Sequence, residues 1–85
     1  MPAVTFENKE QRMALLQWLK NKGYYWHGDS SLSPEDVERL WPFTSYKFLE
    51  PYDSRAIHGL RRTDQRNIVT LPQFCEYINT GKIPI

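Results

Sequence analysis

The sequence feature that most constrains the fold is a helix-start signal that recurs along the chain. In each copy, a side chain that can accept a hydrogen bond from the backbone precedes a polar residue by three positions, as an N-cap precedes its partner in the first turn. The copies are Asn8 with Gln11, Ser33 with Asp36, and Thr70 with Gln73. They predict three helices, separated by segments long enough for short strands.

The residues after each start signal indicate where the helix ends. The first helix should cover about residues 9–22, because Gly23 suits the left-handed position that follows a helix. The second should cover about residues 34–41, since Pro42 cannot continue it. The third begins at Leu71. The apolar residues that should face the core are Leu15, Leu16 and Leu19 in the first helix and Leu71, Phe74, Cys75 and Ile78 in the third.

Segments rich in β-branched and aromatic residues fill the intervals between the helices. They are residues 3–6, 24–27, 45–49, 56–60 and 67–69. No internal repeat, linker or low-complexity segment divides the chain. We therefore expect a single compact α+β domain over residues 1–85, in which a small, mostly antiparallel sheet of three to five short strands packs against two to three helices.

Charge and cysteine content narrow the class of function. The net charge of +1 provides no overall field that would draw the chain to nucleic acid or a membrane. The one cysteine, Cys75, has no partner for an internal disulfide, and it lies on the inward face of the third helix, where we expect an inert thiol. The N-terminus carries no charged-then-apolar leader, and no apolar run is long enough to span a membrane. We therefore expect a cytoplasmic protein that uses no membrane, metal or cofactor.

Aromatic residues are abundant for so short a chain. Three Trp, five Tyr and four Phe make up 14% of the sequence, more than a small core easily holds, so some rings should lie at the surface. Alternation along a strand sends Tyr24 and Trp26 to one face and Tyr25 and His27 to the other. One pair should be core. The outward pair either contacts a partner or packs beneath a loop, and we take Tyr25 and His27 as candidate binding residues.

A second aromatic group surrounds the predicted end of the second helix. Trp41 precedes Pro42, at a helix stop where large rings commonly stay half exposed, so Trp41 is a weaker binding candidate. Tyr46 and Phe48 are two positions apart, a spacing that predicts one buried face of a strand.

The densest chemical feature is the basic segment 55–66, which we expect to form a hairpin. It contains His58 and one aspartate, and its four arginines are Arg55, Arg61, Arg62 and Arg66, so its local charge is +3 with the histidine neutral. The planar fork of arginine suits phosphate and carboxylate groups, which makes the hairpin a candidate grip for a nucleic-acid backbone, a nucleotide or an acidic protein surface. The alternative is a solvated hairpin whose arginines pair loosely with the acidic side chains of Glu35, Asp36 and Glu38.

Catalysis would need more than these parts provide. His27 and His58 are the pair that could act as acid and base in phosphodiester cleavage, as in a small ribonuclease, but nothing in their spacing predicts that they meet. The chain has no glycine-rich phosphate loop, and its histidines, cysteine and carboxylates show no metal-ligand spacing. We expect a protein that is not an enzyme.

Two parts of the chain resemble a group of viral proteins. The run Thr5-Phe6-Glu7-Asn8-Lys9-Glu10-Gln11, a leucine-bearing helix and Lys22-Gly23-Tyr24-Tyr25-Trp26 are similar to the opening of many small accessory proteins of tailed bacteriophages. The run Ile68-Val69-Thr70-Leu71-Pro72-Gln73-Phe74, followed by Tyr77-Ile78, is similar to their endings. The resemblance covers about half of the chain, in packing residues, and Arg61, Arg62 and Arg66 match no motif in it.

The resemblance implies a host-takeover or anti-defence role in the cytoplasm of the infected cell. Together with the surface rings and the basic hairpin, it leads us to expect a non-catalytic binding protein, monomeric or homodimeric, that inhibits or modulates a host enzyme or defence protein. The alternative is binding of nucleic acid or a nucleotide through residues 55–66.

Overall fold

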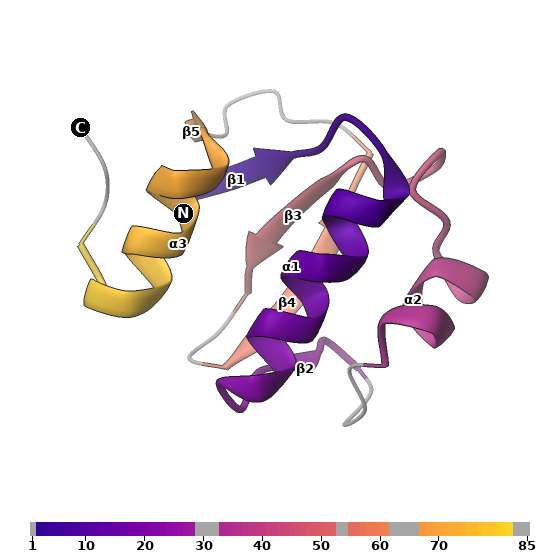
Figure 1. Ribbon diagram of the computed structural model, residues 1–85, viewed down its shortest axis with the longest axis horizontal. Helices are drawn as coiled ribbons and strands as arrows, with labels where there is room; N and C mark the ends of the chain where they lie inside the picture. The colour runs from indigo at the N-terminus through magenta and orange to yellow at the C-terminus, as the bar shows by residue number, and fades with distance from the viewer. Residues whose placement is uncertain (1, 29–32, 53–54, 62–66, 83–85) are drawn as a thin grey trace.

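The computed structural model describes residues 2–28, 33–52, 55–61 and 67–82. Its elements are, in chain order, β1 (Pro2–Thr5), α1 (Lys9–Asn21), β2 (Tyr25–Trp26), α2 (Pro34–Leu40), β3 (Phe48–Pro51), β4 (Ala56–Leu60), β5 (Asn67–Val69) and α3 (Leu71–Thr80) (Figure 1). The predicted α+β class is confirmed.

The five strands form one mixed sheet in the order β2-β4-β3-β1-β5. The pairs β1/β3 and β3/β4 are antiparallel, whereas β1/β5 and β2/β4 are parallel. The expectation of a mostly antiparallel sheet was therefore too narrow. Both parallel pairs join strands that are distant in the sequence, so no local turn residues predict these pairings.

All three predicted helices are present, although one start works differently from the prediction. Asn8 Oδ1 accepts a hydrogen bond from Gln11 N at 2.9 Å, and Thr70 forms a reciprocal capping box with Gln73. Ser33 does not cap α2 with its side chain; its hydroxyl donates instead to Glu35 Oε2 at 3.2 Å. The glycines that follow α1 and α3 take left-handed φ angles, 88° at Gly23 and 75° at Gly81, as a helix end requires.

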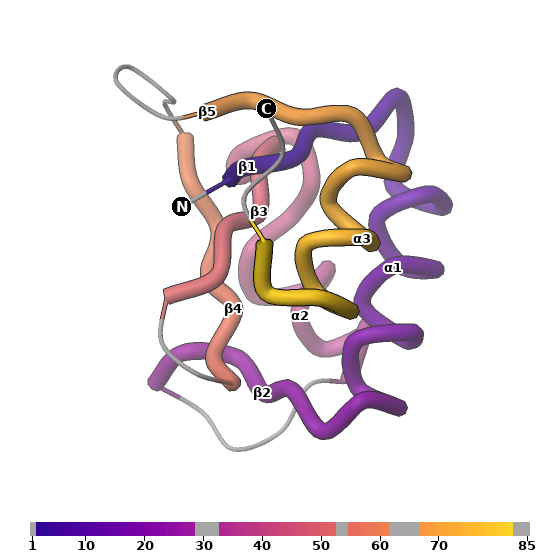
Figure 2. The backbone as a smooth tube through the Cα atoms, turned by 90° about the vertical axis from the view of Figure 1, so that its left-hand side faces the viewer, coloured from indigo at the N-terminus to yellow at the C-terminus, as the bar shows by residue number. Residues whose placement is uncertain are grey.

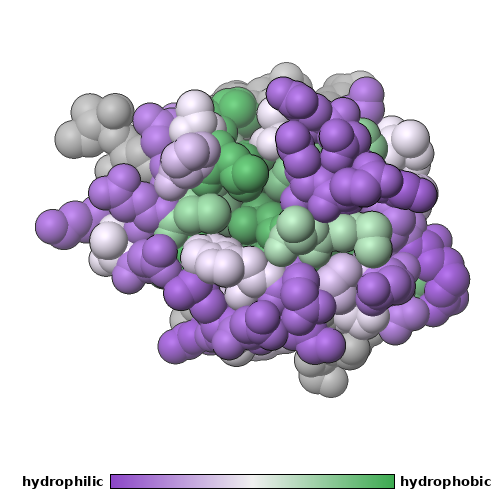
Figure 3. Space-filling model, in the orientation of Figure 1, coloured by the Kyte–Doolittle hydropathy of each residue, from purple (hydrophilic) through white to green (hydrophobic). Residues whose placement is uncertain are grey.

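The molecule has two layers, with the helices on one side of the sheet and the other side uncovered by any helix (Figure 2). Residues of the helices and of the inner sheet face build the core, and the largest fully buried apolar side chains include Leu16, Leu19, Leu49, Ile57 and Phe74. Seen from the helix side, hydrophobic surface gathers between α1 and α3 (Figure 3). The half-buried residues that these two helices pack against the core are Trp18, Leu71, Cys75 and Ile78.

The prediction that Tyr46 and Phe48 share one buried strand face was wrong. Strand β3 begins only at Phe48, whose cross-strand partner is Leu60, and both residues are half-buried on the uncovered face. Leu49, the next residue along β3 and in register with Gly59, is fully buried. Tyr46 lies in the preceding turn and packs closely against Gly59. A Cβ added to Gly59 would lie only 3.0 Å from the Cβ of Tyr46.

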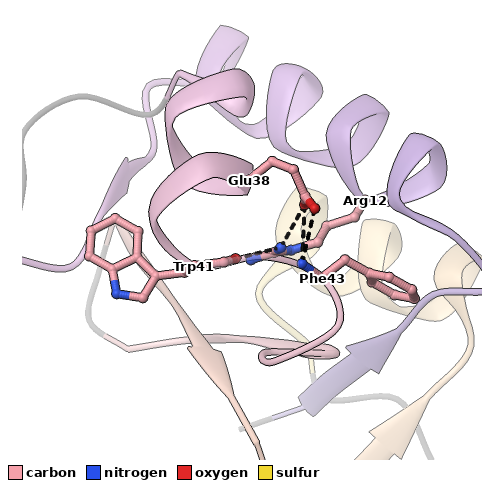
Figure 4. A network of polar contacts seen from close by, with 4 residues as sticks. All are labelled: Arg12, Glu38, Trp41 and Phe43. Carbon is pink, nitrogen blue, oxygen red and sulfur yellow. Dashed lines mark hydrogen bonds and ion pairs between the residues drawn. The ribbon is translucent and has the colours of Figure 1, made fainter.

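A buried ion pair joins α1 to α2 (Figure 4). The fully buried Arg12 donates from Nη1 to Glu38 Oε2 at 3.1 Å and to the carbonyl oxygen of Trp41 at 2.8 Å. The Glu38 carboxylate also accepts the backbone N–H of Phe43 at 3.2 Å. Burial lowers the pKa of Arg12, and the neighbouring Glu38 charge partly offsets that effect. The pair therefore holds α2 and the turn after it against α1.

The acidic side chains of α2 have partners close by in the described part of the chain, while Arg62 and Arg66, with which the alternative interpretation would also pair them, lie outside the described residues. Glu38 pairs with Arg12, Asp36 pairs with Arg39 at 2.9 Å, and Glu35 accepts the Ser33 hydroxyl. Within the described part of the chain, each carboxylate of α2 therefore has a local partner.

Removing Glu38 should destabilise the fold more than removing Arg12. Glu38→Ala leaves a buried guanidinium without its counter-charge and should lower the free energy of unfolding by about 3 kcal/mol. Arg12→Met fills similar space, and it also removes Nε and Nη2, which are buried without a hydrogen-bond partner among the described residues, so its loss should stay below about 1.5 kcal/mol. Urea denaturation measures both values, and an equal or reversed order would contradict this account of the pair.

Candidate binding site on the uncovered face of the sheet

Strand alternation and cross-strand register assign the side chains of the uncovered face. Directly opposed residues share a face, so Tyr25 lies there with Ala56, Glu50 with His58, and Ala3 with Ile68. Of the four large hydrophobic residues that are exposed in the described part of the chain, Tyr25 (37%), Tyr52 (52%) and Ile68 (44%) belong to this side. The fourth, Leu40, lies on α2.

Three rings from separate segments meet on this face and form what we call the ring cluster: His27, Tyr52 and His58. The ring centroids of His27 and Tyr52 are 3.8 Å apart, and those of Tyr52 and His58 are 5.1 Å apart. Backbone hydrogen bonds fix two of the segments on β4, since His27 N donates to Ile57 O and Tyr52 N donates to Ala56 O, each at 2.9 Å. The cluster is thus built on the sheet itself.

Glu50 orients the His58 ring from beside it. Glu50 Oε1 lies 3.0 Å from His58 Nε2, and the exposed fractions of the two side chains are 8% and 22%. An ionised carboxylate can only accept a hydrogen bond, so the Nε2 atom carries the proton. In a neutral ring, Nδ1 is then the nitrogen that can accept a hydrogen bond. The pair therefore presents an imidazole held by a carboxylate next to an exposed phenol.

The structure brings together three of the residues that the sequence singled out, namely Tyr25, His27 and His58. Sequence reasoning missed Glu50 and Tyr52, because the strand predicted at residues 45–49 ended before them. A signal for them was present: extending the alternation of β3 beyond Leu49 sends Glu50 and Tyr52 to the same face.

The remaining described candidates lie in the helix layer. Arg55 donates from Nη1 to Lys22 O at 2.7 Å, with its Cζ 5.7 Å from the centre of the Tyr24 ring. Arg61 Cζ lies 5.0 Å from the centre of the Tyr46 ring. The arginines flank the two ends of β4, so their backbones are roughly 20 Å apart. They do not form one basic grip, and Arg62 and Arg66 lie outside the described residues.

Trp41 has a structural partner. Its ring stacks on the buried Trp26, with centroids 5.2 Å apart and an interplanar angle of 28°. Trp41 is half-buried and packs against the core, so it belongs to the joint between α2 and β2 and not to the uncovered face.

Comparisons with known proteins leave the site to be judged on its geometry. Neither the known protein families nor the curated proteins nor the solved structures contain a significant match to this chain. Among the described residues, no group of three or more His, Cys, Asp or Glu side chains is arranged to hold a metal ion. No helix in those parts of the chain is both long and apolar enough to cross a membrane.

Proposed function

We propose that this protein acts by binding another protein through the ring cluster and the adjacent Tyr25. The observation that carries the proposal is the exposed Tyr52 ring, packed against His27 and beside His58 on the uncovered face. Rings that their neighbours already hold in place lose little conformational freedom when a partner covers them. Tyrosine is also among the residues that most often dominate the energy of a protein interface.

The proposed partner is a host enzyme or defence protein, and the proposed role is inhibition or modulation. This part of the proposal rests on the resemblance to phage accessory proteins and on the near-neutral net charge of +1, which favours a protein over nucleic acid. The described arginines Arg55 and Arg61 lie on the other side of the molecule, against Tyr24 and Tyr46. The rings, and not a basic patch, are therefore placed at the centre of the interface.

Capture of partners from bacterial lysate tests this proposal with a matched control. The double variant Tyr25→Ser/Tyr52→Ser removes two exposed rings of the uncovered face, whereas Leu40→Ser removes a side chain of similar exposure (50%) from α2. We expect the wild-type protein and the control to retain a shared partner that the double variant loses, with an affinity lower by about 30-fold or more.

Circular dichroism of each variant is needed to show that the fold is kept, and the captured protein should then be titrated in purified form. Retention of every partner by a folded double variant would remove the ring cluster from the interface.

A second candidate function is the cleavage of RNA, which one observation favours. The rings of His27 and His58 lie 6.3 Å apart at the centroids, although their sequence spacing gave no sign of it. One imidazole would take the proton of the ribose 2′-hydroxyl as its oxygen attacks the phosphorus, and the other would give a proton to the departing 5′-oxygen. The Glu50 carboxylate would hold one of the two rings in place.

Incubation with single-stranded RNA, alongside gel shifts of RNA and DNA at low and moderate salt, separates the two candidates. The cleavage hypothesis predicts products that disappear in both His27→Ala and His58→Ala, by about 100-fold or more in rate. Nucleic-acid binding through the basic hairpin predicts a shift that weakens steeply as salt rises. If the protein neither shifts nor cuts nucleic acid at low salt, both of these alternatives are wrong.

A further inference from the structure

A cleft of about 340 Å³ lies in the helix layer, on the other side of the molecule from the ring cluster. It is lined by Lys22, Tyr24, Arg55, Ile78 and Asn79. These residues come from the end of α1, the approach to β2, the start of β4 and the last turns of α3 (Figures 1 and 2). Its volume falls at the small end of the range for clefts that bind small molecules.

The charge of the described lining residues is positive. Lys22 and Arg55 contribute two cations, and the other three described lining residues are uncharged. Both cations are held by their surroundings: Lys22 Nζ lies 4.7 Å from the centre of the Trp18 ring, and Arg55 Nη1 donates to Lys22 O at 2.7 Å. A guanidinium and an ammonium are groups that proteins use to bind phosphate.

The remaining described lining consists of one aromatic, one aliphatic and one amide side chain. Tyr24 and Ile78 offer apolar surface, and both pack against the core, so their positions are set by the fold. Asn79 adds an amide that can both donate and accept hydrogen bonds, as the edge of a nucleobase requires. Base stacking on an aromatic side chain is a common source of affinity for nucleotides.

We propose that this cleft binds a mononucleotide, with the phosphate on Lys22 and Arg55 and the base against Tyr24 and Ile78. The inference is independent of the proposed protein interface, because the two sites share no residue.

Cys75 offers a chemical probe of this cleft. It is the one cysteine of the chain, it precedes Ile78 by one turn of α3, and it is half-buried. Burial raises the pKa of its thiol, and the charge of Lys22 partly offsets that effect. A ligand bound at Lys22 should therefore slow alkylation of the thiol.

The test measures the rate of Cys75 alkylation by iodoacetamide, together with calorimetric titration, for AMP, GMP, CMP and UMP. Inorganic phosphate and the matching nucleosides are titrated in parallel. We expect at least one nucleotide to slow alkylation about fivefold or more at saturation and to bind at least about tenfold more tightly than phosphate or its nucleoside. Failure of all four nucleotides, or equal affinity for phosphate alone, would overturn the proposal.

Two charge reversals at the C-terminal end of α1 complete the test. Lys22 lines the cleft, whereas Lys20 is exposed two positions earlier and points to a different side of the helix. Lys22→Glu and the milder Lys22→Gln should each weaken nucleotide binding about tenfold or more, and Lys20→Glu should leave it unchanged. Equal effects of Lys22→Glu and Lys20→Glu would show general electrostatics instead of a site, and that result would also contradict the proposal.

Discussion

A sheet that carries its helices on one face alone leaves its other face without a helix over it, and the location of the ring cluster follows from this constraint. The inward side chains of the central strands, such as Leu49 and Ile57, are fully buried under the helices. The alternate side chains of the same strands are then directed away from the core, where Glu50 and His58 meet in register. Because side chains alternate along a strand, burying one face of the sheet under the helices also determines which side chains point outward on the opposite face.

The Arg12–Glu38 pair shows how the smallest helix is fixed in this arrangement. Helix α2 buries few apolar residues, chiefly Pro34 and Val37, so apolar burial supplies only part of its attachment. The charge-assisted contact between Arg12 and Glu38, at 3.1 Å, adds a directional attachment. The same two side chains also hydrogen-bond the backbone oxygen of Trp41 and the backbone N–H of Phe43. The cost of the pair is the burial of a guanidinium, which is why the balance between desolvation and pairing decides the stability of this joint. The stacking of Trp41 on Trp26 also attaches the end of α2 to β2, the edge strand of the sheet.

The parts of the fold that depend on neighbours in sequence were predictable, and those that depend on distant strands were not. Asn8 and Thr70 cap their helices as their local chemistry dictates, and the alternation around Trp26 places Tyr25 and His27 correctly. The parallel pairing of β2 with β4 joins segments about thirty residues apart, and it alone brings His27 near His58.

The same limit applies to the basic residues. Arg55 and Arg61 look like one patch in the sequence, yet a five-residue strand separates them and each contacts a different tyrosine. The composition of the hairpin alone does not predict to which side of the sheet its long side chains point. The direction of those side chains is set by the rings and carbonyls that the rest of the chain places beside them.

The central claim is that the uncovered face holds a ring cluster assembled from three segments, and nuclear Overhauser spectroscopy of the aromatic protons tests it most directly. The structure predicts cross-peaks between His27 and Tyr52, whose ring centroids are 3.8 Å apart, and weaker ones between Tyr52 and His58 at 5.1 Å. Cross-peaks between Trp26 and Trp41, at 5.2 Å, serve as the internal standard on the helix side. If the tryptophan cross-peaks are present while those of the ring cluster are absent, the cluster does not form and the proposed interface loses its basis.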